Sequence, residues 1–181
     1  MDSTENSSKV NALDFQFGVG QADNQYVQFH IGDINMAVSI LSIQEIIEPL
    51  ELHNVPNAKD KFLGVANLRG EILGVIDLAK CCAQNATTYE DQRLLVFRTE
   101  NGLQAAAVDG VDAVVTIPPT SIDKNPPMRA KVPSDFIDGV SSVKDQLVTI
   151  VNLKNLLENE ELIEFEEAIE ATSLPKIEGE S

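Results

Sequence analysis

The chain has 181 residues, enough for one domain or two small ones, and a formal net charge of −16. Half of this charge lies in residues 158–181, which contain nine acids and one base, whereas residues 26–157 contain sixteen acids and eleven bases. Because phosphates are neutralised by clustered Lys and Arg, this balance argues against nucleic acids and anionic membrane surfaces as partners. No stretch approaches the roughly 20 apolar residues of a membrane span, and the polar start lacks the apolar core of a signal peptide. We therefore expect a cytoplasmic protein without membrane insertion.

The N-terminal part of the chain begins with a polar segment and continues into a hairpin. Ser, Asn, Asp and Gln dominate residues 1–24, which predicts a disordered N-terminal tail. Most residues of 26–31 are β-branched or aromatic, and Gly32-Asp33 is a turn signal before a second strand at 36–38. The isoleucines of residues 40–47 have the spacing of a short helix, but their β-branched side chains leave a strand open.

A second hairpin follows after a short extended segment. Residues 64–68 and 72–76 predict two strands, with Arg69-Gly70 as the turn between them. Asp77 then stands where an N-cap is expected, directly before a short helix at residues 78–82.

After a polar linker at residues 83–91 the pattern of strands begins again. Residues 94–97 and 103–108 are apolar runs on either side of Asn101-Gly102. Both residues of this dipeptide tolerate positive φ, which a tight hairpin turn requires, so the segment predicts a third hairpin. A fourth hairpin is predicted at residues 140–143 and 147–151, with its turn at Lys144-Asp145.

An internal repeat links the two parts of the chain. Residues 139–153 align with residues 64–78 at one constant offset, with identical or conservative residues at most positions, and the apolar positions of 29–47 recur at 97–115. The repeat predicts two copies of one all-β unit of four to five short strands. Each copy is too small to bury a core alone, so we expect each to curl into a small barrel and to pack against the other.

The C-terminal part of the chain is apolar at helical spacing. Leu, Ile and Phe residues between 152 and 171 predict one or two helices with a Glu-rich outer face. Residues 159–181 are therefore expected to form an acidic C-terminal helix and tail, whose role is to stay solvated and keep the chain soluble.

The sequence contains no pattern that indicates a cofactor, a metal site or catalysis. The phosphate-binding patterns G-x-x-x-x-G-K-S/T and G-x-G-x-x-G are absent, and neither histidine has a metal-ligand partner nearby in sequence. The adjacent Cys81 and Cys82 lack metal spacing and are expected to pack a short helix. Asp77 leaves two interpretations open, a helix cap or the reactive carboxylate of a small hydrolase or transferase. Asn152 at the equivalent repeat position favours the cap.

Arg69 is the most conspicuous candidate for binding. It lies in Asn67-Leu68-Arg69-Gly70, where a guanidinium at a tight turn presents a fork of donors to a partner's carboxylate or carbonyl groups. The alternative is an intramolecular salt bridge from Arg69 to Glu45 or Glu71. Sequence spacing leaves both interpretations open.

Six sequence blocks occur in a specific order. The most specific are Gly64-Val65-Ala66-Asn67-Leu68-Arg69-Gly70 and, shortly after it, Val75-Ile76-Asp77-Leu78. The others are Tyr26-Val27-Gln28-Phe29, Gln44-Glu45-Ile46-Ile47, Ala107-Val108-Asp109-Gly110-Val111 and Phe136-Ile137-Asp138-Gly139-Val140. Together these blocks resemble the CheW family of chemotaxis coupling proteins.

The resemblance implies an all-β fold with short helices, made of two SH3-like five-stranded β-barrels around a shared core. It implies one CheW-like domain at residues 25–158, built from two intertwined barrel halves at about residues 25–90 and 91–158.

The resemblance also implies a function without catalysis. Members of the family connect the cytoplasmic tip of transmembrane chemoreceptors to the regulatory domain of the histidine kinase CheA, and they associate in array rings. The implied location is therefore the cytoplasmic side of membrane-anchored receptor arrays, with no cofactor. Asn67 and Arg69 match the receptor-facing region, and the other matching positions carry receptor or kinase contacts or a tight backbone turn. The implied binding residues are Ile43, Glu45, Gly64, Asn67, Arg69 and Leu94.

Two other functions remain open at this point. One is a coupling protein of a related receptor–kinase pathway, such as twitching motility, which the identity of the partner kinase would distinguish. The other is the small hydrolase or transferase that would use Asp77.

Overall fold

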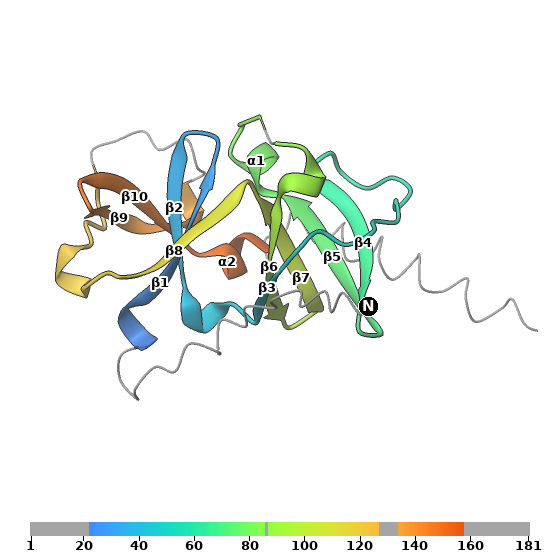
Figure 1. Cartoon of the computed structure of the whole chain (residues 1–181), viewed down its shortest axis with the longest axis horizontal. Coiled ribbons are helices and arrows are strands. Elements are labelled where there is room, and N and C mark those ends of the chain that lie inside the picture. Colours follow the sequence, from blue (N-terminus) through green and yellow to red (C-terminus); the bar gives the residue numbers. More distant parts are fainter. Residues whose placement is uncertain (1–21, 86, 127–133, 158–181) are drawn as a thin grey trace, which may run out of the picture.

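The computed structural model describes residues 22–85, 87–126 and 134–157. Strands dominate this part of the chain (Figure 1). Residues 1–21 of the predicted N-terminal tail and the whole predicted C-terminal segment 159–181 lie outside the described residues. The strands are β1 (Gln25–Ile31), β2 (Ile34–Ser39), β3 (Glu45–Ile47), β4 (Phe62–Leu68), β5 (Glu71–Asp77), β6 (Arg93–Thr99), β7 (Gly102–Val108), β8 (Gly110–Thr116), β9 (Ile137–Val143) and β10 (Gln146–Val151).

Short helices lie between and after the strands. The α-helices are α1 (Leu78–Cys81) and α2 (Leu153–Leu157), and the 3-10 helices are η2 (Ala22–Asn24), η3 (Ile40–Ser42), η4 (Tyr89–Asp91), η5 (Pro119–Ser121) and η6 (Ser134–Phe136). Each of the two interpretations of residues 40–47 therefore holds for a part of that segment, because η3 is helical and β3 is a strand.

Most tight turns lie where the sequence predicts them, but the turn predicted at Asn101-Gly102 lies one residue earlier, at Glu100-Asn101, because Gly102 pairs with Thr99 as the first residue of β7. Arg69 and Gly70 have φ values of 50° and 87° between β4 and β5, and Lys144 and Asp145 have 48° and 64° between β9 and β10. Positive φ at both central residues gives a two-residue turn whose twist matches the flanking strands. The register then follows, with Leu68 opposite Glu71.

Two five-stranded sheets result, as the sequence predicts. The first sheet has the order β8-β1-β2-β10-β9, and the second has the order β3-β6-β7-β5-β4. The pairs β2–β10 and β5–β7 are parallel, and the remaining pairs are antiparallel. If β1–β5 are matched in turn with β6–β10, the two orders become identical, so the sequence repeat is also a structural repeat.

Neither sheet corresponds to one copy of the repeat. The hairpin β1–β2 lies between β8 and β10 of the other copy, and the hairpin β6–β7 lies between β3 and β5. The expectation that each copy curls into its own barrel is therefore corrected, because the two copies exchange their first hairpins.

Single bridges connect the edge strands of each sheet instead of continuous ladders. His53, in the segment after β3, pairs with Val65 of β4, and Asp123, in the segment after β8, pairs with Val140 of β9. Each bridge makes the sheet SH3-like without closing it into a fully hydrogen-bonded barrel.

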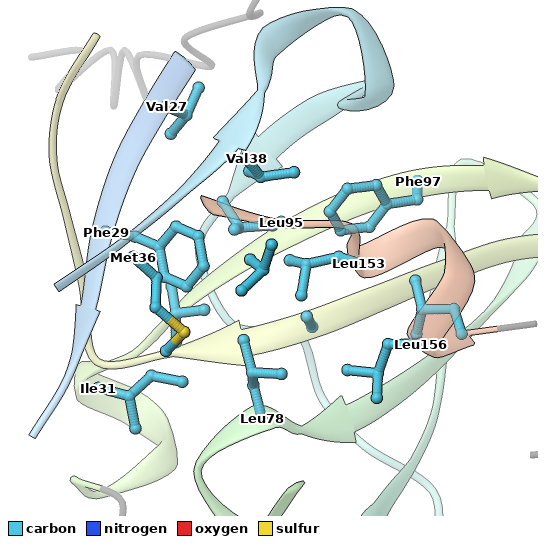
Figure 2. Close-up of a cluster of buried hydrophobic side chains, with 14 of the residues drawn as sticks. Val27, Phe29, Ile31, Met36, Val38, Leu78, Leu95, Phe97, Leu153 and Leu156 are labelled. Carbon is cyan, nitrogen blue, oxygen red and sulfur yellow. The ribbon is translucent and has the colours of Figure 1, made fainter. Parts of the chain in front are cut away.

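The largest apolar cluster lies between the two sheets and contains side chains from both. Phe29 and Met36 of the first sheet share it with Leu95 and Phe97 of the second (Figure 2). Helix α2 lies between the sheets in Figure 1 and adds Leu153, Leu156 and Leu157 to this cluster. Two smaller clusters fill the individual sheets. Because the main core is shared, burial stabilises both sheets together.

Candidate functional site

The turn between β4 and β5 is held by its own side chains. Asn67 accepts a hydrogen bond from the Gly70 amide, with 2.8 Å between Oδ1 and N. This contact mimics a backbone turn and is the reason why Asn suits the position before a tight turn. Asn67 and Arg69 are both exposed, so the turn presents polar groups to solvent.

Arg69 donates a hydrogen bond from Nη2 to Oε1 of Glu45, and the two residues form an ion pair. Of the two interpretations of Arg69, the structure therefore contains the intramolecular bridge to Glu45. The hydrogen bond and the charge of Glu45 raise the pKa of Arg69 above its usual value. The Arg69 side chain nevertheless remains 52% exposed, whereas that of Glu45 is only 5% exposed. One end of the pair thus faces solvent and the other lies in the protein.

This ion pair connects the two edges of the second sheet. Glu45 lies in β3 and Arg69 lies at the end of β4, which are the first and last strands in the order of that sheet. The pair therefore fixes the turn against the opposite edge strand. A substitution that removed the guanidinium of Arg69 would leave the buried carboxylate of Glu45 without its counter-charge, which would destabilise the fold.

A second pair of charges lies beside the first. Arg98 of β6 donates to Glu71, with 3.1 Å between Nη2 and Oε2, and also donates from Nε to Oε1 of Gln44 at 3.1 Å. Glu71 therefore accepts hydrogen bonds from Arg98, and it acts on Arg69 through its charge. Four charged side chains of alternating sign thus lie at the turn, namely Glu45, Arg69, Glu71 and Arg98. They form a network of charges and not one isolated surface pair.

Ile72 is a site residue that sequence reasoning missed. It is directly opposite Asn67 in the β4–β5 ladder and is 42% exposed. Leu147 at the equivalent repeat position is 46% exposed. Single exposed apolar side chains are ordinary on protein surfaces, but Ile72 is exposed opposite a polar residue of the turn, and nothing in the sequence alone distinguishes it from a core isoleucine. We call Asn67, Arg69 and Ile72 the turn surface.

Gly64 lies where the chain approaches its neighbour closely. Its φ is 142°, and a Cβ built there would lie 2.6 Å from the main-chain oxygen of His53. His53 and Val65 exchange two backbone hydrogen bonds at this point, of 2.8 and 3.0 Å. A glycine is therefore required at this position. The close approach of the two backbones is the geometric reason why Gly64 matches a family position with a tight backbone turn.

Ile43 and Leu94 lie in the interior. Ile43 is 4% exposed in the cluster between the sheets, and Leu94 is fully buried opposite Ile47 in the β3–β6 ladder. Neither side chain is presented to a partner in this structure. Leu94 shares a cluster with Ile47 of β3, and Ile43 lies two residues before that strand, so both help to hold the strand that carries Glu45.

Asp77 caps a helix. Its Oδ1 accepts hydrogen bonds from the amides of Ala79 at 3.0 Å and Lys80 at 3.3 Å, and the residue is 5% exposed. Asn152 accepts from the Asn155 amide in the same way before α2. The cap interpretation is confirmed, and the hypothesis of a reactive carboxylate at Asp77 loses its basis, since the group is buried and engaged.

The remaining candidates for chemistry, a cysteine thiol and a groove lined by carboxylates, do not combine into a catalytic or metal site among the described residues. Burial raises the pKa of the Cys82 thiol to about 12, so the thiol stays protonated at neutral pH. A groove of about 690 Å³ beside residues 48–52 and 89–93 contains four carboxylates, but neither Asp77 nor a histidine or cysteine lines it. Among the described residues no three His, Cys, Asp or Glu side chains are placed to hold a metal ion. Within the same residues no helix has the length and apolar character needed to cross a membrane.

The described residues form two interlocked SH3-like sheets, and the candidate site consists of ion pairs and an exposed apolar residue around a tight turn. The family model described as the CheW-like domain matches residues 25–161, and the chain belongs to that family. It is accordingly a CheW-like protein.

Curated relatives and a solved structure agree with this assignment. The chain is 31% identical over 148 residues to the chemotaxis protein CheW of Helicobacter pylori, covering 79% of this chain and 89% of that protein. It is 27% identical over 145 residues to CheW of Klebsiella aerogenes, covering 80% and 86%. It is 24% identical over 139 residues to protein FrzA of Myxococcus xanthus, covering 75% and 86%. The scaffolding protein TtCheW of Thermoanaerobacter tengcongensis has the same fold, with a TM-score of 0.69, 24% identity and coverage of 77% and 90%.

Proposed function

We propose that this chain is a non-enzymatic scaffold that couples the cytoplasmic tips of transmembrane chemoreceptors to the regulatory domain of the histidine kinase CheA. Membership of the CheW-like family and relatives named chemotaxis protein CheW support this proposal. The proposed location is the cytoplasmic side of receptor arrays, where copies of the chain also contact one another in rings. No cofactor takes part, since binding alone carries the signal.

The turn surface is the observation that carries the proposal. Arg69 is half-exposed while its charge is already balanced by Glu45, and Ile72 lies beside it with 42% of its surface exposed. A partner that brings a carboxylate and an apolar side chain gains contacts to both residues. Each contact is weak because Arg69 is shared with Glu45, and many copies in an array sum such contacts by avidity.

The buried members of the site act through position. Leu94 packs against Ile47 and Ile43 precedes β3, so both determine where β3 lies. Since β3 carries Glu45, a displacement of this strand moves the counter-charge of Arg69. We propose that Ile43, Leu94 and Gly64 affect receptor or kinase binding in this indirect way and that Asn67 and Arg69 contact the receptor.

A binding experiment with two matched variants tests the proposal. Ile72→Asp introduces a charge on the turn surface, and Leu147→Asp introduces the same charge at the repeat-equivalent, similarly exposed position of the first sheet. We expect Ile72→Asp to weaken binding of a receptor cytoplasmic fragment about tenfold, equivalent to about 1.4 kcal/mol, with Leu147→Asp near the parent value. Equal affinities for both variants contradict the assignment of the turn surface.

The choice of variant follows from the ion pair. Arg69→Glu would place a second carboxylate against the buried Glu45 and would destabilise the fold, so lost binding would have two explanations. Arg69→Lys keeps the charge and loses the planar fork of donors. We expect it to weaken receptor binding without a change in the circular dichroism spectrum. The same samples, tested against the CheA regulatory domain, show whether the kinase uses a different surface.

A related receptor–kinase pathway, such as twitching motility, is the second candidate. The similarity to FrzA favours keeping it, because the relatives of this chain include a protein not named CheW. The partner kinase separates the two candidates. Preferential binding to the regulatory domain of a kinase from another pathway, with no binding to CheA, would support the second.

A further inference from the structure

The two halves of the chain are interlocked through the sheets. We call residues 22–85 the N-terminal half and residues 87–157 the C-terminal half. Of the eight strand ladders, four join the halves, namely β1–β8, β2–β10, β3–β6 and β5–β7. The other four are hairpins or neighbouring pairs within one half. Neither half can therefore complete a five-stranded sheet by itself.

These ladders require that an N-terminal half meet a C-terminal half, but not that both belong to one chain. The β1–β2 hairpin finds the same partners in β8 and β10 of any copy. The same holds for the main core, in which Phe29 and Met36 of one half contact the cluster that includes Leu95 and Phe97 of the other. Only the connection between the halves distinguishes pairing within one chain from pairing between two copies.

That connection crosses from one half to the other over a short distance in sequence. The Gln84 amide still donates to the Ala79 carbonyl at 2.8 Å, which holds it on the end of α1. The Thr87 amide and hydroxyl both donate to Oδ1 of Asp109 at 3.1 Å, which holds Thr87 on the C-terminal half. Asn85, between these anchors, is exposed. Asn85 can therefore change its conformation without uncovering a buried side chain.

We propose that the chain binds a second copy of itself by exchanging halves, with the connection after Gln84 as the hinge. In this dimer the N-terminal half of each copy pairs with the C-terminal half of the other, and all eight ladders and the shared core are retained. This inference is independent of the proposed coupling function, because it rests only on topology.

The balance between monomer and exchanged dimer depends on the hinge. Two halves joined by a short flexible connection meet at an effective concentration on the order of millimolar, so the monomer is favoured in dilute solution. Shortening the hinge prevents the halves of one chain from meeting and removes this advantage. Ala83, at φ 52°, begins the segment that must straighten.

The first experiment changes the length of the hinge in the full chain. Deleting residues 83–85 removes about 10 Å of reach, and we expect it to convert the chain of 19.7 kDa to a species of twice that mass by light scattering. A matched control inserts six Gly and Ser residues after Asn85 and should remain a monomer. A shortened chain that folds as a monomer overturns the proposal.

A disulfide distinguishes exchange from side-by-side association. Gln25 of β1 and Thr116 of β8 are opposite one another in an inter-half ladder and share a hydrogen bond of 2.7 Å. We expect Gln25→Cys with Thr116→Cys, in a chain with Cys81→Ser and Cys82→Ala, to form a disulfide, since paired strand positions have suitable spacing. Combined with the deletion, it should link two chains covalently on a non-reducing gel. A dimer with only intrachain disulfides overturns the proposal.

A second measurement covers the case in which the shortened chain does not fold. The Gln25→Cys, Thr116→Cys chain with its natural hinge is refolded from denaturant at about 1 µM, far below the expected effective concentration, and at about 1 mM, comparable with it. Interchain disulfides that form only at the higher concentration support exchange. Their absence at both concentrations overturns it.

Discussion

Gly64 offers the sharpest test of how the second sheet is built. An alanine there would keep φ at 142° and place Cβ 2.6 Å from the His53 main-chain oxygen and 3.3 Å from its carbonyl carbon. The positive φ costs about 1–3 kcal/mol for a residue with a Cβ. Relief of the clash separates His53 from Val65 and sacrifices two backbone hydrogen bonds, each worth about 1 kcal/mol. We expect Gly64→Ala to lower the free energy of unfolding by about 3–5 kcal/mol, the sum of these two contributions.

Urea denaturation measures this loss, and a neighbouring glycine supplies the control. Gly70 has φ 87°, but a Cβ there meets no atom within 4 Å, so Gly70→Ala should cost only the conformational part, about 1–2 kcal/mol. Gly139→Ala, whose Cβ would lie 2.7 Å from the Asp123 oxygen, should resemble Gly64→Ala. A midpoint for Gly64→Ala no lower than that of Gly70→Ala would refute the argument from close backbone approach.

Three further substitutions probe the interior and the caps. Leu94→Ala, at a fully buried position, should cost about 2–5 kcal/mol in chemical denaturation; a negligible change would mean that β3 and β6 are held by other contacts. Asp77→Ala should cost about 0.5–2 kcal/mol through the lost helix cap, and a hydrolytic activity abolished by this change would instead revive the catalytic hypothesis. Asp109→Asn should cost about 1–2 kcal/mol at neutral pH. Burial raises the pKa of Asp109, but hydrogen bonds from Gly32 and Thr87 outweigh it and hold the pKa below 3.8. A carboxyl group whose pKa is lower in the folded than in the unfolded state stabilises the fold at pH values above that pKa. The difference in free energy of unfolding between Asp109→Asn and the parent should therefore shrink as the pH falls below about 3.8. A constant difference would exclude the charge as its cause.

The local features of the fold were accessible from the sequence. Turns at Arg69-Gly70 and Lys144-Asp145, and caps at Asp77 and Asn152, depend on a few neighbouring residues, and the structure confirms them. These features are set by side-chain chemistry within about four positions of the chain, which is the range that propensity rules describe.

The pairing of strands was not accessible in the same way. The exchange of the first hairpins follows from contacts such as Val27 with Val114, which no short window of sequence contains. Strand β8 was missed as well, because Gly110 and Asp112 interrupt its apolar pattern and only Val115 of the strand is buried. Propensity describes the edge strand of a sheet poorly, since its exposed positions are free to be polar.

The candidate site was accessible only in part. The sequence indicated Arg69 as a donor, either to a partner or to a carboxylate of the same chain. The bridge to Glu45 forms because β3 and β4, the two edge strands of the second sheet, come close to each other in the fold. Ile72 was overlooked because an isoleucine in a strand is normally a core residue. Its exposure is a property of the tertiary fold and not of its neighbours in sequence.

The shared core also determines how the molecule loses its structure. Side chains of both sheets and of α2 contribute to one apolar cluster, and half of the ladders join residues far apart in the chain. A structure with so many non-local pairings forms slowly. Neither sheet can melt while the other remains intact, because each would expose its side of the shared apolar cluster to water. Unfolding is therefore expected to be a single cooperative transition, and the chain has no half-melted form in which one sheet keeps its surface while the other loses it.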